Sequence, residues 1–534
     1  MFSIFRATRL ATCVIGMLAG SCSSAVLANP VGSVFGPAMT YAVGINPVGM
    51  TVIDLGNGHP DIVVANTGDN TIGVLLGNGD GTFQPQVVYT VPTAGQLDVI
   101  FDVTDLGNGH LDIVVNDGTA VSVLLGKGDG TFQPPVNYPL TSGLTNLTVT
   151  DLGNGHPDIV GFTNAGVGVL IGNGDGTFQS EVAYADMPGY LNFNPIGVAD
   201  LGNGHPDMVA TEDNNCSPSF TGTPTCTNYV VVFLGKGDGT FQSPSHNQIG
   251  GNFVPCIGGF LADLGNGYPS VICESTGFNL NTQSSNPNFA TIYTMVGNGD
   301  GSFQSPGVPY SETGAADVTV ADLGSGHPDL VLIGTTCPYS GTGVCSSGIA
   351  VVLGNGDGSF QPPLTNSVNG TPTGYVIADF GNGHPDIAVN GFDISGGSAS
   401  LNILLGNGDG SFQPSIVLPT IQGTYPAINI TEIDAADFNG DGLPDIGLLN
   451  APPNAVGSVV VMLNEGPMAS GGGSTASGGG MHSGGVDSLS LLFLAVLAVL
   501  KSRGRIGKSC QKSRGAQDKN GDIRTTWFRI RAFL

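Results

Sequence analysis

The chain contains 534 residues, with 86 glycines, only 10% charged residues and a formal net charge of −27. This length is enough for a large hydrophobic core or for several domains. Between Pro30 and Met468 there are two lysines, Lys127 and Lys236, and no arginine. Such a surface has little with which to hold phosphate groups, which argues against nucleic acid and nucleotide partners and favours cations.

The N-terminal residues 1–28 have the pattern of a secretory signal peptide. Arg6 and Arg9 precede an apolar run, and small residues follow up to Ala28, the expected cleavage position. The stretch "LAGSC" offers a rival interpretation, a lipoprotein signal with Cys22 as the lipid anchor. Both interpretations predict export, so we expect a secreted or surface-attached protein in an oxidising compartment.

Residues 29–466 consist of a repeat. The acidic loop "DLGNGHPD" begins at Asp54 in the first unit, and a loop of this kind begins eight times, the last time at Asp437. A second motif, "LLGNGDGTFQP" at 75–85, follows the loops in seven full copies, and "VMLNEGP" at 461–467 takes the eighth place. Each unit reads as strand, acidic loop, strand, strand, Gly-Asp-Gly turn and strand. This order is typical of a four-stranded antiparallel propeller blade.

The two ends of the repeat region complete each other. The stretch "GSVFGPAMTYAVG" at 32–44 matches the end of a unit, and the eighth unit lacks that end. We therefore predict an all-β chain that forms a single β-propeller, with residues 35–44 as the outer strand of the last blade. We expect eight blades, with seven as the alternative. An open solenoid would need caps at both ends and would leave the complementary half-units unexplained.

Units four to six are longer because of polar inserts between their second and third strands. Equivalent loops of consecutive blades emerge on one face, and loops on a rigid scaffold often bind ligands. We therefore predict a ligand patch for a glycan or a protein, unless the inserts are merely unconstrained; no tryptophan lies within the repeats to stack on a sugar. Its candidate residues are Phe220, Tyr229, Phe278, Phe289 and Tyr339. The predicted disulfides are Cys216–Cys226 and Cys337–Cys345, with Cys256–Cys273 as a third candidate.

The eighth acidic loop, "DFNGDGLPD", offers the oxygen ligands that calcium requires. Calcium takes six to eight oxygens, which alternating residues of a tight loop can supply. The predicted ligands are the side chains of Asp437, Asn439, Asp441 and Asp445 and the carbonyl of Leu443. The alternative is an Asx-turn that only orders a hairpin.

The repeats at about 35–465 resemble the FG-GAP/VCBS repeat family, best known from the propellers of integrin α-subunits. The stretch "VFGPAMTY" keeps the Phe-Gly pair of that family. The resemblance implies a β-propeller with calcium loops of the pattern Asp-x-Asn/Asp-x-Asp-Gly-x-x-Asp between the first two strands of a blade. One loop here, the eighth, meets this pattern in full.

The other acidic loops are one residue shorter, and Asn57 stands where the eighth loop has Asp441. Fewer ligands and less negative charge both weaken calcium binding. These loops are therefore either weak calcium sites or Asx-turns, and the fifth, with Ser270 in place of the closing aspartate, is expected to bind no metal. The candidate ligands are Asp54, Asn57, Asp61, Asp105, Asn108, Asp112, Asp151, Asn154, Asp158, Asp200, Asn203, Asp207, Asp322, Asp329, Asp379, Asn382 and Asp386.

Six loops carry a histidine in a slot that holds Tyr268 and Leu443 in the other two. One histidine per blade would be spread around the ring, so we expect structural histidines and neither a zinc site nor a catalytic site. The motif "GNGDGTF" lacks the helix and the lysine of a phosphate-binding loop, and is interpreted as a hairpin turn. "KGD" at 127–129 and 236–238 is the same turn with Lys for Asn, or alternatively an adhesion tripeptide.

The C-terminal part begins with a Gly/Ser-rich linker at 467–488. An apolar run and a basic tail follow at 489–510, and the run Leu489–Leu500 is shorter than the ~20 residues of an ordinary membrane span. This arrangement resembles the GlyGly-CTERM sorting signals of Gram-negative bacteria, which implies processing at the membrane and delivery to the surface. The alternative is a weak anchor, and residues 511–534 have no assigned role.

Taken together, these patterns predict an exported, monomeric, calcium-binding β-propeller that serves recognition or adhesion. No Ser/His/Asp constellation or metalloprotease motif occurs, so we do not expect an enzyme. The alternatives are a carbohydrate-active lyase or hydrolase on a propeller, and a structural component of a surface layer. An enzyme that acts on anionic polymers would need basic residues to bind its substrate, and the repeats contain two lysines. Paired carboxylates could serve hydrolysis, but the repeat itself accounts for each Asp cluster.

Overall fold

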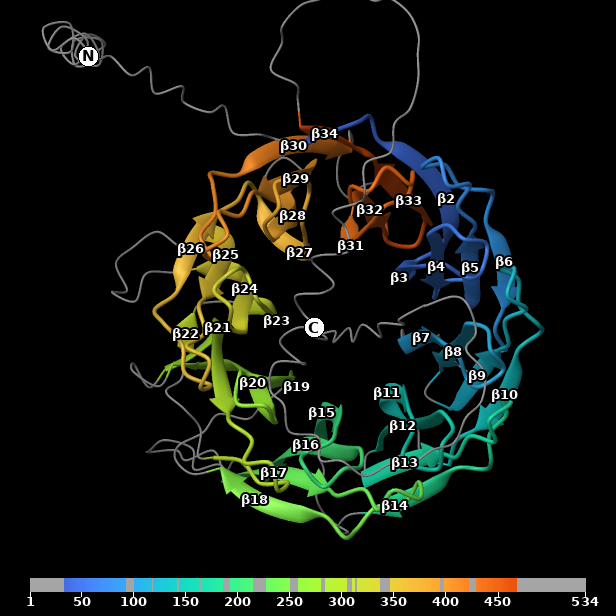
Figure 1. Ribbon diagram of the computed structural model, residues 1–534. Helices are drawn as coiled ribbons and strands as arrows, with labels where there is room; N and C mark the ends of the chain where they lie inside the picture. Colours follow the sequence, from blue (N-terminus) through green and yellow to red (C-terminus); the bar gives the residue numbers. More distant parts are fainter. Residues whose placement is uncertain are drawn as a thin grey trace, which may run out of the picture. The chain divides into compact units, whose positions relative to one another are not determined.

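The computed structural model contains eight four-stranded antiparallel sheets arranged in a ring as a β-propeller (Figure 1). The described part of the chain has no helix, and hence none that could cross a membrane. The predicted signal peptide, linker and sorting signal lie outside the described residues. These are 33–92, 100–117, 119–141, 144–163, 166–185, 193–214, 227–249, 258–279, 284–304, 310–312, 315–336, 346–393, 398–421 and 429–467.

Each of the first seven blades uses four successive strands, and the innermost of them faces the centre of the ring (Figure 1). The first four blades are β3 (Pro47–Ile53), β4 (Asp61–Asn66), β5 (Thr71–Leu75), β6 (Val87–Thr90); β7 (Ile100–Thr104), β8 (Asp112–Asn116), β9 (Ala120–Leu124), β10 (Val136–Pro139); β11 (Thr145–Thr150), β12 (Asp158–Thr163), β13 (Gly166–Leu170), β14 (Val182–Ala185); and β15 (Phe193–Ala199), β16 (Asp207–Asn214), β17 (Thr227–Phe233), β18 (Ser245–Ile249). The next three are β19 (Gly258–Asp263), β20 (Pro269–Asn279), β21 (Ser284–Met295), β22 (Tyr310–Glu312); β23 (Ala315–Ala321), β24 (Asp329–Thr336), β25 (Ser346–Val352), β26 (Leu364–Ser367); and β27 (Thr371–Ala378), β28 (Asp386–Asp393), β29 (Ser398–Leu404), β30 (Ile416–Ile421).

The eighth blade joins the two ends of the repeat region. Its inner strands are β31 (Ile430–Ala436), β32 (Asp445–Asn450) and β33 (Val456–Met462), and its outer strand is β2 (Met39–Ile45) from the start of the repeats. A further strand, β1 (Ser33–Phe35), pairs with β34 (Asn464–Pro467). The predicted eight blades and the predicted closure by the N-terminal segment are confirmed, and the seven-blade alternative is wrong.

The core consists of apolar layers between consecutive blades. All side chains of β4 and β5 are buried, because the blades cover both faces of these middle strands. Val63 of the first blade and Ile113 of the second, for example, belong to one apolar cluster. This two-sided burial explains why the second strand of each unit is a short continuous apolar run without polar alternation. Each buried Val or Ile contributes about 1.5–3 kcal/mol.

Candidate functional site

The short acidic loop of the first blade connects β3 to β4 and folds as an Asx-turn. Asp54 Oδ1 accepts hydrogen bonds from the backbone N–H groups of Gly56, at 2.8 Å, and Gly58, at 2.9 Å. Asn57 Oδ1 accepts the N–H of His59 at 2.9 Å. The side-chain oxygens that could serve as ligands are therefore used to hold the loop itself.

Asp61, the closing aspartate of this loop, is completely buried at the start of β4. Its Oδ2 accepts the N–H of Leu55 at 2.9 Å, and its Oδ1 accepts the N–H of Gly77 at 2.8 Å and the side-chain amide of Asn57 at 2.7 Å. Burial raises the pKa of Asp61, and these three donors oppose that rise. Both oxygens of this carboxylate are thus satisfied within the blade.

The other short loops repeat this arrangement. In the sixth loop Ser325 takes the place of the asparagine and donates to Asp329 at 2.9 Å. Burial likewise raises the pKa of Asp112, Asp207 and Asp386. The asparagines Asn108, Asn154, Asn203 and Asn382 each donate their side-chain amide to the second aspartate of their loop. The aspartates of these loops are paired as Asp105 with Asp112, Asp151 with Asp158, Asp200 with Asp207, Asp322 with Asp329 and Asp379 with Asp386.

The fifth loop closes without a second carboxylate. Ser270 Oγ accepts the N–H of Gly297 at 3.2 Å, and Asn266 donates its side-chain amide to the Gly297 carbonyl at 2.8 Å. A hydroxyl can therefore replace the aspartate in the turn, which agrees with an ordering role for these loops.

The eighth loop is longer and carries one more carboxylate. Asp437 accepts the N–H of Gly440 through Oδ1 at 2.7 Å and the N–H of Gly442 through Oδ2 at 2.8 Å. Asp441 accepts the N–H of Leu443 at 2.8 Å and the side-chain amide of Asn439 at 3.0 Å. The five predicted ligands therefore lie on one tight loop at the start of β32.

Asp445 differs from the closing aspartates of the short loops. It is completely buried and accepts the N–H groups of Phe438, at 2.8 Å, and Asn464, at 2.6 Å, but no side-chain amide takes the place of Asn57. Burial, together with repulsion by Asp441 and Asp437, raises the pKa of Asp445 to about 6. The hydrogen-bond donors around this loop therefore do not fully compensate the negative charge of its three carboxylates.

The donor chemistry of the eighth loop fits a calcium ion. Carboxylate, amide and carbonyl oxygens on a glycine-containing loop are the ligands that calcium prefers, and a cation would relieve the repulsion at Asp445. In the described residues no group of three or more His, Cys, Asp or Glu side chains surrounds a single point. An ion bound here would therefore have to draw Asp437, Asp441 and Asp445 together.

The Gly-Asp-Gly turns link neighbouring blades. In the first blade Asp80 Oδ1 accepts the N–H and the hydroxyl of Thr82, at 3.0 and 2.5 Å, and these bonds lower the pKa of Asp80. Gly81 then donates its N–H across the blade boundary to the carbonyl of Phe438 in the eighth acidic loop, at 3.0 Å. The two repeated motifs thus form one contact between adjacent blades.

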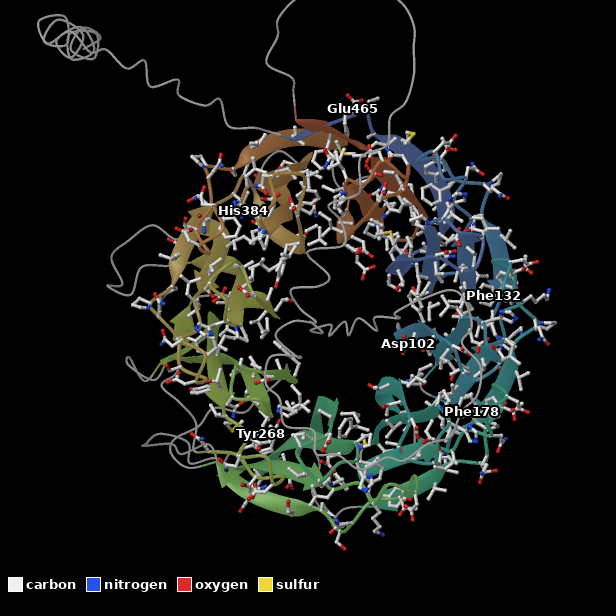
Figure 2. All side chains as sticks on the ribbon, in the orientation of Figure 1. Asp102, Phe132, Phe178, Tyr268, His384 and Glu465 are labelled. Carbon is white, nitrogen blue, oxygen red and sulfur yellow. The ribbon has the colours of Figure 1, made fainter. Side chains whose placement is uncertain are left out.

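The histidines pack on their own turns. A Cβ atom on Gly79 would lie 2.3 Å from the exposed His59 ring, so the ring lies directly on the turn, and the φ of +78° at Gly79 favours glycine there. Figure 2 shows His384 and Tyr268 far apart on different blades. The described histidines of these loops are not gathered at one site, as expected for structural residues.

The lysine-containing turns keep the hydrogen bond of the asparagine-containing ones. Lys127 N–H donates to the Thr131 carbonyl at 2.9 Å, as Asn78 N–H does to the Thr82 carbonyl at 2.9 Å. "KGD" at 127–129 is therefore the predicted hairpin turn with a different exposed side chain. The adhesion alternative for this tripeptide stays a prediction.

The predicted ligand patch is only partly covered by the structure. Phe220 and Tyr339 lie outside the described residues. Phe278 and Phe289 lie in strands β20 and β21, because the described residues of the fifth unit's insert extend these two strands; their pairing shifts between Thr276 and Gly277. Tyr229 lies in β17, with its ring edge-on to His246 at 6.0 Å.

The predicted disulfides cannot be followed in full within the described residues. Cys216, Cys226, Cys337, Cys345 and Cys256 lie outside them. Cys273 is buried in β20 and disulfide-bonded. Its pairing with Cys256 stays a prediction.

Sequence patterns did not single out two polar contacts. Glu212, buried in β16, lies 3.3 Å from His246 Nδ1 in β18, and Glu432 on β31 accepts the N–H of Met50 in the next blade. Most other units have non-acidic residues at these two places, which was the available signal, although Asp117 and Asp317 are equivalent to Glu212 and Glu432. Asp102, an acid on the innermost strand β7, lies at the inner edge of its blade (Figure 2), and burial raises its pKa.

The fold and its loops define an eight-bladed β-propeller with repeated acidic loops. Residues 380–448, which run from the seventh blade into the eighth, match the family model of the FG-GAP-like repeat. The predicted resemblance is thereby supported over the residues that contain the eighth loop. No curated protein matches the chain in sequence.

Two solved structures give distant likenesses. A lectin of Agrocybe aegerita, described as recognising non-reducing terminal N-acetylglucosamine, is 19% identical over 72% of this chain and 94% of the lectin, with a TM-score of 0.42. The Tc holotoxin pore of Photorhabdus luminescens is 16% identical over 76% of this chain and 20% of the toxin chain, with a TM-score of 0.27. Neither score is high enough to support an argument about function.

Proposed function

We propose that this chain is an exported recognition or adhesion module whose propeller binds calcium at Asp437–Asp445. The observation that carries the calcium proposal is the excess negative charge of the eighth loop. There, three carboxylates share a loop and the pKa of Asp445 rises to about 6. The short loops, in which each closing aspartate receives a side-chain donor, act as Asx-turns in this proposal.

Calcium at the eighth loop would act where the eighth blade meets the first and seventh blades. Phe438, the residue after Asp437, accepts the N–H of Gly81 from the first blade at 3.0 Å. Asn464, which donates to Asp445 at 2.6 Å, also donates its side-chain amide to Phe380 of the seventh blade at 3.1 Å. The loop is thus bonded to both neighbouring blades, and an ion that fixes it would stabilise blade eight from two sides.

Recognition is assigned to the opposite face of the ring. In an antiparallel blade the acidic loop and the Gly-Asp-Gly turn emerge at one end, and the connection between the second and third strands emerges at the other. The inserts of units four to six leave the scaffold at that other end, from β16, β20 and β24. A polar surface of this kind suits a glycan or a protein ligand.

The proposal includes the setting in which the module works. The chain acts as a monomer outside the cell, secreted or attached to the surface of a Gram-negative bacterium, without nucleic acid partners and with membrane contact only through its C-terminal segment. The sequence features that support this are the signal-like residues 1–28, the sorting-signal-like residues 489–510 and the scarcity of lysine and arginine in between. No observation in the described residues favours the enzyme or surface-layer alternatives.

Calcium titration calorimetry on residues 33–467 tests the metal site. Wild type should bind about one calcium ion per chain at the affinity of an extracellular or sensor-type site. Asp441→Asn, which gives the loop the residue found in the short loops, should strongly weaken binding because it removes an exposed negative charge without touching the buried Asp445.

Asn57→Asp is the matched control, since it adds a carboxylate to a short loop. It should leave the eighth site unchanged. Six or more ions per wild-type chain would contradict the proposal, because the short loops would then be metal sites. Unchanged binding in Asp441→Asn would place calcium somewhere else.

A further inference from the structure

The chain carries many Asn-Gly pairs, and two sets of them recur with the repeat. Asn-Gly is the peptide sequence most prone to loss of the side-chain amide, because glycine offers no Cβ to hinder its own backbone nitrogen. Six pairs lie in the short acidic loops, a seventh, Asn439-Gly440, lies in the eighth loop, and five lie in Gly-Asp-Gly turns, where the second and fourth blades have lysine instead. The loop asparagines are Asn57, Asn108, Asn154, Asn203, Asn266 and Asn382, and the turn asparagines are Asn78, Asn173, Asn298, Asn355 and Asn407.

In the acidic loops the reacting groups are held apart by hydrogen bonds. The N–H of Gly58 donates to Asp54 at 2.9 Å, and the same bond of 2.9 Å recurs for the glycine after each of the six loop asparagines. The Asn57 side chain is fixed at both ends, by Asp61 at 2.7 Å and by the N–H of His59 at 2.9 Å. The nucleophile and the carbonyl carbon that it would attack are both immobilised.

In the turns the asparagine is held, but the glycine nitrogen that would attack it has no recorded acceptor. Asn78 is exposed and donates its amide to the Thr82 hydroxyl at 2.9 Å. The structure records no hydrogen bond from the N–H of Gly79, nor from the equivalent glycine of the other four turns, all of which lie in the described residues. The nitrogen is free to approach the asparagine carbonyl carbon.

We propose that the five turn asparagines are sites of spontaneous deamidation and that the acidic loops shield their own asparagines from it. The deprotonated backbone nitrogen of the glycine attacks Cγ of the asparagine, the bond from Cγ to Nδ2 breaks, and ammonia leaves. Water then opens the resulting five-membered imide at either carbonyl, which yields aspartate or isoaspartate. Each event adds one negative charge to a face that already carries the acidic loops.

The modification acts on the contact between blades. In a deamidated first turn the donor to Thr82 is lost and a new carboxylate lies two residues from Asp80. Isoaspartate also lengthens the backbone of the turn that brings the Gly81 N–H to Phe438. Deamidation therefore loosens the blade boundary without needing an enzyme or a ligand, and this inference is independent of the proposed calcium site.

The test is peptide mapping by mass spectrometry after incubation of the folded chain at alkaline pH in ¹⁸O-labelled water, with a parallel sample in urea. Shielded positions react only through local opening, so the folded turns should react roughly tenfold or more faster than the folded loops. In urea the two classes should react at similar rates. Equal rates for the two classes in the folded chain would overturn the proposal. It would also be overturned if the turns reacted faster than the loops by the same factor in urea, because local sequence would then account for the difference in rate.

The second blade allows the shielding hydrogen bond to be tested alone. Its turn has Lys127 in place of asparagine, so Asn108-Gly109 is the one Asn-Gly pair in the acidic loop and turn of this blade. Asp105→Ala removes the acceptor of the Gly109 N–H and should raise the rate at Asn108 toward that of the turns. Asp129→Ala, in the turn of the same blade, is the matched control and should leave Asn108 slow. An unchanged rate in a folded Asp105→Ala would contradict the shielding mechanism. If that variant does not fold, the comparison of the two wild-type classes still decides the proposal.

Discussion

At the scale of single residues, the acidic loops differ at one position that we expect to separate a plain turn from the proposed metal site. Asn57 gives its amide to Asp61, whereas the eighth loop has Asp441, which adds to the repulsion felt by Asp445. The sequence could identify the positions but left both readings of the short loops open. The donors that reach these carboxylates from other segments, the N–H of Gly77 for Asp61 and the N–H of Asn464 for Asp445, are invisible to a pattern confined to the loop.

Asp445 predicts that the free energy of unfolding depends on pH when no metal is bound. Its pKa is raised to about 6, so the folded state holds the proton more tightly than the unfolded state does. The stabilisation that comes from protonation is complete below the unfolded pKa near 4 and is lost as the pH rises through about 6. With a chelator present, the free energy of unfolding should therefore fall between about pH 4 and pH 7.

Denaturant unfolding across this range, with and without calcium, measures the effect. Calcium should remove this decline in the free energy of unfolding, because the bound ion stabilises the ionised form of Asp445 in the folded state. Asp445→Asn is the control that cannot titrate at this position, and its metal-free profile should be flatter. A metal-free wild type that gains stability from pH 5 to 7 would show that other groups dominate.

At the scale of elements, the repeat allowed the strands and turns to be predicted but not the inserts. The Gly-Asp-Gly motif specifies its hairpin in seven copies, each with the bridge that pairs Gly77 with Phe83 in the first blade. The insert of the fifth unit was predicted as a loop and is an extension of β20 and β21. Such residues have no counterpart in other units, so no register could be transferred to them.

Two glycines of one acidic loop allow a clean test of the contact between blades. Gly56 and Gly58 both have positive φ, +112° and +87°, so alanine at either costs roughly 1–2 kcal/mol of backbone strain. A Cβ on Gly56 would also lie 2.5 Å from the Gly128 carbonyl oxygen of the second blade, whereas a Cβ on Gly58 meets nothing within 4 Å. We expect Gly56→Ala to lose a further ~1–3 kcal/mol of unfolding free energy.

Urea unfolding of the two variants side by side measures this difference, and Gly58→Ala serves as the control for strain alone. Equal losses would mean that the second blade shifts away without cost. The acidic loop would then not be a structural contact between blades.

At the scale of the whole molecule, the complementary half-units predicted how the ring closes, and the structure shows how closely the chain ends imitate a normal blade. The N–H of Gly36 donates to the Leu463 carbonyl at 2.8 Å, as Gln84 does to Leu76 at 2.8 Å in the first blade. Phe35 thus takes the place of the turn phenylalanine and packs edge-on against Phe380 at 5.7 Å. The Asn464 side chain bonds to Phe380 in place of a turn glycine. The sequence showed that Asn464 stands where the other units have glycine, but not which group it would contact.

This split turn predicts a graded response to shortening the N-terminus. A chain that starts at Ser33 keeps every described contact and should fold with full stability. A start at Met39 removes β1 and the buried Phe35, a loss comparable to the ~3–5 kcal/mol of a buried Phe→Ala change. A start at Pro47 also removes β2, which uncovers the edge of β33 with its buried Val459 and Val461, so this chain should misfold or self-associate.

Thermal unfolding and light scattering on the three chains distinguish these outcomes, with removal of the residues after 467 as the control that leaves the ring intact. A synthetic peptide of residues 33–45 should bind the shortest chain and restore a monomer, because it supplies the missing strand in trans. A chain starting at Pro47 that is monomeric and as stable as the one starting at Ser33 would contradict closure by β2. The ring would then be held by contacts between blades alone, and the pairing of the two chain ends would be incidental to its stability.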